Sequence, residues 1–188
     1  AEVWLSPAKN PDRKLKFTWE MIRIMRSLVG VNTQHPNTLV AEAIAAGMVP
    51  SLMDFENLRR EVKYGKNSRI DVLLEMSDDR HCYVEVKNVT MRRDLTKGAP
   101  AEFPDGVTSR GTKHLAELSD MVKKGHQAVM FYLLQRGDAD SMTIARDIDP
   151  KYGEALDQAR EAGVEVFAFN CKLTPNAITV ANPVKFLG

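Results

Sequence analysis

The sequence has few cysteines and no long apolar run. Its 188 residues include only Cys82 and Cys171. Two such distant cysteines give neither a disulfide framework nor a metal-binding spacing, so we expect each to be a reduced residue of the core. No apolar run approaches the roughly 20 residues that a membrane-spanning helix needs. The first ten residues, AEVWLSPAKN, lack the basic start and apolar core of a signal peptide, which favours a cytoplasmic protein with no membrane partner.

The net charge is small, only +1, but the charged residues are unevenly distributed along the sequence. The segment 59–69 contains one acid, Glu61, against five bases: Arg59, Arg60, Lys63, Lys66 and Arg69. The segment 138–161 is acidic instead, with seven acids against three bases. A basic segment of this kind suits an approaching polyanion such as a nucleic acid. A solvated basic hairpin explains the same charges equally well.

The segment 68–89, SRIDVLLEMSDDRHCYVEVKNV, has the pattern of a β-hairpin. Two apolar runs are joined by a polar turn at 77–80. Side chains alternate across a strand, so Glu85 and Lys87 project from the same face. If Asp71 on the first strand faces that side too, an aspartate, a glutamate and a lysine meet on a rigid sheet.

Such a trio suits the hydrolysis of a phosphodiester. Two nearby carboxylates repel each other unless a cation lies between them, and Mg²⁺ prefers oxygen ligands. The metal lowers the pKa of a bound water, and the lysine orients that water or stabilises charge on the phosphate. The alternative is that Glu85 and Lys87 form an ordinary surface ion pair. Asp71, inside an apolar strand, is harder to dismiss, because a buried unpaired carboxylate is costly.

Two helices flank this hairpin in the sequence. The segment 36–48 starts with Pro and Asn and ends at Gly47, and its only charged residue is Glu42. Glu42 is either a further ligand of the metal site or part of one exposed stripe. The segment 112–124 is amphipathic, and Arg110, Lys113 and His114 lie at its N-terminal end, where amides and positive side chains can hold a phosphate. His114 is equally consistent with a histidine beside the core.

The remaining pattern predicts an α/β fold. We expect a hairpin over 2–24, strands over 28–33, 58–64, 127–134, 164–170 and 177–180, and a helix over 149–162. The segment 91–108 has no clear periodicity and indicates a long loop near the site. The order of helices and strands favours a mixed sheet covered by helices.

A helix, three strands with Asp and then Glu-x-Lys, a helix and a strand form the pattern of the PD-(D/E)XK nuclease superfamily. The segments PNTLVAEAIAAG, LRREVKYGKNSRIDVLL, CYVEVKNVT, FPDGVTSRGTKHLAEL and EALDQAREAGVEVFAF resemble the sugar fermentation stimulation protein A family. The resemblance runs from about Asn32 to the C-terminus. Members of that family are described as bacterial proteins that bind DNA without marked sequence preference. They pair an N-terminal OB-fold-like barrel with a C-terminal PD-(D/E)XK-like domain. The resemblance implies that residues 1–31 are the last strands of a barrel that is incomplete in this chain, and that residues 32–188 are the nuclease-like domain.

The resemblance also implies roles for particular residues. Asp71 and Glu85, with Glu42, would hold Mg²⁺ or Mn²⁺, and the carbonyl of Val86 could complete the ligands. Asp71, Glu85 and Lys87 would be the catalytic set. Four residues would contact nucleic acid: Arg69, Arg110, Lys113 and His114.

Three hypotheses about function follow. The first is a metal-dependent nuclease acting on DNA or on RNA, and a homodimer is an option because many nucleases that cut both strands are dimers. The second is a non-catalytic, sequence-nonspecific DNA-binding protein that regulates sugar-utilisation genes of the maltose type. The third is an α/β domain in which the ion-pair cluster is a relict without function.

Overall fold

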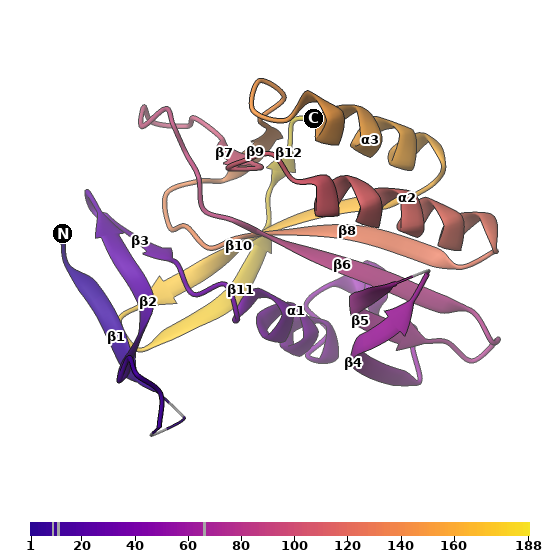
Figure 1. Cartoon of the computed structure of the whole chain (residues 1–188), viewed down its shortest axis with the longest axis horizontal. Helices are drawn as coiled ribbons and strands as arrows, with labels where there is room; N and C mark the ends of the chain where they lie inside the picture. The colour runs from indigo at the N-terminus through magenta and orange to yellow at the C-terminus, as the bar shows by residue number, and fades with distance from the viewer. Residues whose placement is uncertain (9, 11, 66) are drawn as a thin grey trace.

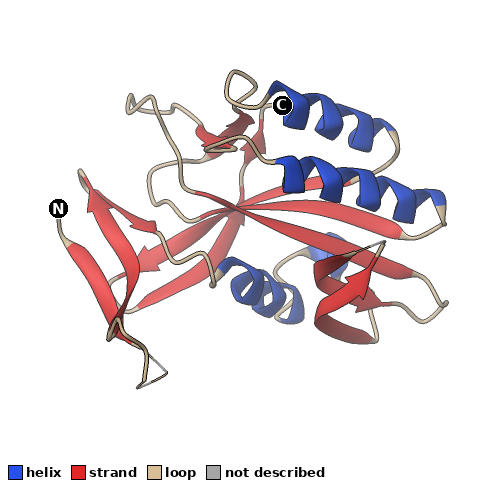
Figure 2. Cartoon of the chain, viewed as in Figure 1, coloured by secondary structure: helices blue, strands red, loops and turns tan. Residues whose placement is uncertain are grey.

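A six-stranded mixed sheet forms the centre of the protein, as seen in a computed structural model that describes residues 1–8, 10, 12–65 and 67–188 (Figure 2). Strands β6, β8 and β10 are parallel to one another, and the other neighbours pair antiparallel. In spatial order the strands are β11 (Ala177–Pro183), β10 (Glu165–Thr174), β8 (Gln127–Leu134), β6 (His81–Val89), β5 (Ser68–Glu75) and β4 (Asn57–Tyr64). The mixed sheet flanked by helices that the sequence predicts is therefore confirmed.

Each face of this sheet packs against helices (Figure 1). Helices α2 (Ser109–Lys123) and α3 (Pro150–Glu161) lie together on one face, and α1 (Pro36–Ala45) covers the other. Strand β8 is apolar throughout because both of its faces are buried. Met130, Tyr132 and Leu134 pack toward α2 and α3, while alternate residues of the strand pack toward α1.

Capping residues tie the starts of α2 and α3 together. Thr108 caps α2, since its side chain accepts a hydrogen bond from the Gly111 N–H at 3.0 Å. Asp149 caps α3 by accepting from the Tyr152 N–H, and its other oxygen accepts from the Thr108 N–H at 2.7 Å. The N-terminus of α2, which faces the predicted site, is thereby held in place.

Two small sheets flank the central one. The first consists of β1 (Val3–Pro7), β2 (Phe17–Ile24) and β3 (Ser27–Gly30), as the predicted hairpin suggests, and its turn includes residues 9 and 11, which lie outside the described residues. The second consists of β7 (Ala101–Phe103), β9 (Ser141–Ile144) and β12 (Lys185–Phe186). Reading 91–108 entirely as loop was therefore wrong at β7. A 3₁₀ turn, Pro50–Leu52, follows α1.

Both cysteines are free and buried, as predicted. Burial raises the pKa of the Cys171 thiol to about 12, so this thiol is protonated and unreactive at neutral pH. None of the described helices is long and apolar enough to cross a membrane.

Candidate active site at the fork of β5 and β6

The candidate site lies where the pairing of β5 and β6 ends. The two strands pair antiparallel from Glu75 opposite His81 to Val72 opposite Val84. Beyond this pair, the Val86 N–H of β6 donates to a side chain of β5, since Asp71 Oδ2 accepts its hydrogen bond at 2.7 Å. This contact places a carboxylate beside the segment of β6 that carries Glu85 and Lys87.

Glu85 is buried at the centre of the site, with 2% of its surface exposed. Its Oε1 atom accepts a hydrogen bond from the Lys87 Nζ at 2.7 Å and contacts the His114 Nδ1 atom of α2. Its Oε2 atom is also buried, yet it has no hydrogen-bond partner among the described residues. Because Glu85 is buried and only 15% of the Lys87 side chain is exposed, the surface ion-pair interpretation is wrong.

The two carboxylates differ in their pKa values. Burial and, next, the negative charge of Glu85 raise the pKa of Asp71 to about 6, against the opposing effects of the Val86 N–H and the Lys87 ammonium. Burial also acts to raise the pKa of Glu85, but the contacts with His114 and Lys87 lower it overall. The site therefore holds a firmly ionised glutamate beside an aspartate that repels it, an arrangement that a cation would stabilise.

The residues predicted to bind nucleic acid lie together around the mouth of the site. A hollow of about 440 Å³ is lined by Glu61, Asn67, Ser68, Arg69, Arg110, Lys113 and His114. Lys66 of the same basic segment lies outside the described residues. His114 needs a correction, because it is buried against Glu85 rather than open to a phosphate. Its Nε2 atom lies 3.4 Å from the Arg110 Nε atom, so it links the carboxylate to the rim.

Glu42 does not join this cluster. It is exposed on α1 and lines a different hollow of about 410 Å³, together with Trp4 and Ile178. The metal-ligand prediction for Glu42 is therefore corrected, and the alternative of an exposed stripe describes it. Glu42 lies on a face of α1 turned away from Asp71, whereas the first turn of α1 supplies the residue that reaches the site.

Asn37 and Glu61 belong to the site, and the sequence reasoning missed both. The Asn37 Nδ2 atom donates to Asp71 Oδ1 at 2.6 Å and lies 3.1 Å from Glu61 Oε1. Glu61 has a φ of 54°, a left-handed conformation that is rare for a residue with a side chain. Glu61 carried a signal, as the one acid in a basic segment, whereas Asn37 was read only as part of a helix start.

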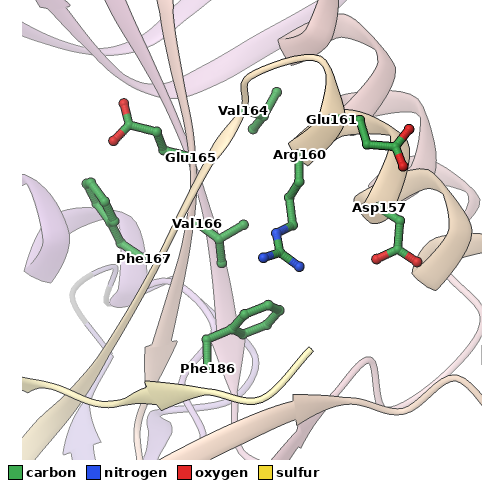
Figure 3. Close-up of a pocket in the computed structure, with 8 residues that line it drawn as sticks. All are labelled: Asp157, Arg160, Glu161, Val164, Glu165, Val166, Phe167 and Phe186. Carbon is green, nitrogen blue, oxygen red and sulfur yellow. The ribbon is translucent and has the colours of Figure 1, made fainter.

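Other features of the structure lie apart from this site. A hollow of about 670 Å³ is bounded by α3, β10 and β12, where the Arg160 guanidinium lies 5.5 Å from the centre of the Phe186 ring (Figure 3). It includes none of the predicted site residues.

Within the described part of the chain, no three side chains of histidine, cysteine, aspartate or glutamate are grouped so as to hold a metal ion.

The fold and the site define an α/β protein with a mixed sheet, flanking helices and an Asp–Glu–Lys cluster around the buried Glu85, where two strands diverge. The chain belongs to the sugar fermentation stimulation protein family. The family described as "Sugar fermentation stimulation protein RE domain" matches residues 34–177.

Two relatives called "Sugar fermentation stimulation protein homolog" show how close this membership is. The one from Paramagnetospirillum magneticum is 55% identical over 183 residues, covering 97% of this chain and 76% of the relative. The one from Rhodospirillum centenum is 56% identical over 178 residues, covering 95% of this chain and 75% of the relative. A solved structure, Pyrococcus furiosus SfsA in complex with Ca²⁺, shares the fold with a TM-score of 0.86 at 23% identity, covering 98% of this chain and 77% of that one.

Proposed function

We propose that this chain is a divalent-metal-dependent nuclease that hydrolyses phosphodiester bonds of DNA, on a sheet of the PD-(D/E)XK kind. One observation carries the proposal: Asp71, Glu85 and Lys87 converge below the surface, and a buried Glu85 oxygen has no hydrogen-bond partner among the described residues. A carboxylate taken out of water destabilises a protein unless something compensates its charge, and the raised pKa of Asp71 indicates that its charge is not fully compensated. A site kept at that cost is better explained by function than by structure.

The donor set fits Mg²⁺ or Mn²⁺. Asp71 and Glu85 offer carboxylate oxygens, and the backbone carbonyl of Val86 lies between Glu85 and Lys87 in the chain, which is the kind of ligand these hard cations prefer. When bound, the cation would polarise a phosphoryl oxygen and lower the pKa of a coordinated water. The relative from Pyrococcus furiosus, solved with Ca²⁺, supports an oxygen-preferring cation in this family.

The side chains have separate tasks in this proposal. In hydrolysis the water oxygen bonds to phosphorus, the ester bond to the leaving oxygen breaks, and the leaving oxygen takes a proton. Lys87 orients the attacking water and stabilises charge on the phosphate, since its ammonium already lies against Glu85. Arg69, Arg110 and Lys113 line the hollow in front of the site and hold the phosphodiester backbone.

The test is incubation with plasmid, linear duplex and single-stranded DNA, and with RNA, in Mn²⁺ and in EDTA. Wild type should cleave at least one substrate in Mn²⁺ only, and Lys87→Ala should not. Lys172→Ala removes a similar charge from an exposed position of β10 and should cleave like wild type. Equal cleavage by Lys87→Ala would place the activity elsewhere. If neither protein cuts yet both shift DNA on a gel, the chain is a non-catalytic DNA-binding protein, as in the alternative that it regulates sugar-utilisation genes.

We also propose that β1, β2 and β3 belong to an OB-fold-like barrel. Leu5 pairs with Trp19 and Pro7 with Phe17, so these side chains share one face of the small sheet. Leu5, Trp19 and Phe17 are exposed there. An apolar sheet face is normally covered, and the inside of a barrel would cover it.

A further inference from the structure

Three hollows adjoin around the turn between β4 and β5, and together they extend the site into a groove. The first, of about 440 Å³, is lined by His114, which contacts Glu85, and it shares Arg69 with a second hollow of about 400 Å³. The second shares Lys63 with a third of about 580 Å³, and Lys113 lines both the first and the third. The groove therefore leads from the candidate active site along α2, from Lys113 to Lys124.

Aromatic rings line the far part of the groove. Tyr83 and His126 both line the third hollow, with ring centres 5.5 Å apart, and the ring centre of Tyr64 lies 5.5 Å from that of Tyr83. Tyr83 precedes Glu85 by two residues on β6 and projects from the same face of that strand. Two residues of strand span about 7 Å, so the backbone of Tyr83 lies at about that distance from the backbone of Glu85.

The groove also carries unpaired positive charge. In the part of the chain that the structure describes, Lys63, Arg69 and Lys124 form no ion pair, whereas away from the groove Arg93 pairs with two acids. Each acid along the groove lies near a polar partner. Asp120 lies 3.6 Å from the Lys123 Nζ, and Glu61 is hydrogen-bonded to Asn37. Glu117 lies 3.7 Å from the Lys113 Nζ, although neither of its buried oxygens has a hydrogen-bond partner among the described residues.

We propose that this groove binds a single-stranded segment of DNA, with a base stacked on Tyr83 and His126 and the phosphates held by the lysines and Arg69. Positive charge along a groove with aromatic rings on its wall is the arrangement that holds single strands without sequence preference. A regular duplex keeps its bases paired and stacked inside, so it offers no free base to stack on Tyr83 and His126. The inference deepens the proposed function and rests on it only for the position of the cleaved bond.

The experiment measures binding in Ca²⁺ by fluorescence anisotropy, with labelled oligothymidine of about 12 nucleotides and a blunt duplex of the same length. Wild type should bind the single strand at least tenfold more tightly than the duplex. Tyr83→Ala should weaken single-strand binding roughly 5- to 150-fold, because stacking on one base contributes about 1–3 kcal/mol. Tyr83→Phe keeps the ring and should bind within twofold of wild type.

A second variant does not depend on the folding of Tyr83→Ala. Lys124→Glu changes an exposed residue after α2 and should weaken single-strand binding at least fivefold, whereas Lys172→Glu on β10 should not. If Lys63, Arg69, Lys113 and Lys124 each contact a phosphate, log Kd should change with log salt by about 3, at about 0.7 per contact.

Two results would overturn the groove proposal. One is that wild type binds the duplex as tightly as the single strand. The other is that Tyr83→Ala binds like Tyr83→Phe and Lys124→Glu binds like Lys172→Glu. Cleavage and binding separate the two proposals, because the nuclease proposal requires Lys87 for cleavage, whereas the groove proposal requires Tyr83 for binding of the single strand. Binding that depends on Tyr83 without any cleavage in Mn²⁺ would refute the nuclease and keep the groove. Cleavage that depends on Lys87, together with single-strand binding that does not depend on Tyr83, would keep the nuclease proposal and refute the groove proposal.

Discussion

Replacing Asp71 by Asn should stabilise the metal-free protein at neutral pH while it abolishes metal-dependent cleavage. The pKa of this largely buried carboxyl is raised from the ordinary 3.8 to about 6. At about 1.4 kcal/mol for each tenfold change in acidity, ionised Asp71 destabilises the folded state by about 3 kcal/mol. Asn has the same shape, its oxygen can accept the hydrogen bond from the Val86 N–H, and the Asn37 amide can rotate to meet the new NH₂ group. We therefore expect a gain of about 1–3 kcal/mol.

The gain should depend on pH with a definite sign. Because the folded-state pKa of Asp71 lies above its unfolded value, the folded protein binds more protons between about pH 4 and pH 6, and this group destabilises it progressively as pH rises through that window. Above about pH 6 the cost is complete, and below about pH 4 it is absent. The difference in unfolding free energy between Asp71→Asn and wild type should therefore grow from near zero at about pH 4 to its full value at about pH 7.

Urea unfolding in EDTA over this pH range measures that difference directly. Asp78→Asn is the matched control, because a hydrogen bond from Arg80 lowers the pKa of this exposed carboxyl and its replacement should not stabilise the protein. Adding Mg²⁺ should stabilise wild type, by about 2.7 kcal/mol at one hundred times the Kd, and leave Asp71→Asn unchanged. A variant less stable than wild type at pH 7 in EDTA, or a difference that does not vary with pH, would refute the raised pKa of Asp71 that we attribute to burial and to the charge of Glu85.

Three further changes test other parts of the site and its supports. His114→Ala removes the contact that orients Glu85 and should weaken Mn²⁺ binding 10- to 100-fold in calorimetry; unchanged affinity would deny His114 that task. Gly65→Ala should lower the unfolding free energy by more than about 1 kcal/mol, because φ is +58° and the new Cβ would lie 2.8 Å from Glu117 Oε1. Gly98 also has a positive φ, of +84°, but no atom lies within 4 Å of the position of a new Cβ, so Gly98→Ala should cost less. Asp149→Ala should cost about 2 kcal/mol in thermal unfolding, through the lost cap of α3 and the lost contact with Thr108, and Asp149→Asn should recover part of it.

Local pattern was sufficient to predict the central sheet and half of the site. Glu85 and Lys87 are two residues apart on a strand, so their shared face follows from strand geometry alone. Strand β8 and helix α2 were found by apolar runs and apolar periodicity that burial imposes on the sequence. Asp71 was recognisable because a carboxylate inside an apolar strand needs a reason.

Contacts between distant segments could not be predicted in this way. Strands β7, β9 and β12 are only two to four residues long and exist because they pair across the fold, so they carry no periodic signal. Glu42 and Asn37 show the same limit on one helix. Both are polar residues of α1, and only the packing of that helix decides that Asn37 meets Asp71 while Glu42 faces another hollow.

Glu61 gives independent support for a functional site. It interrupts β4 with a left-handed backbone, and the pairing of β4 with β5 runs through Arg60 opposite Val72 and Val62 opposite Ile70 on either side of it. Such a conformation costs of the order of 1–3 kcal/mol and persists only where the surrounding structure holds it. The strained residue lies against Asn37, which also binds the carboxyl that burial and a like charge destabilise. Strain in the backbone and repulsion between side chains, which arise from unrelated causes, therefore meet within a few ångströms, and sequences depart from local stability in this way where a site requires it.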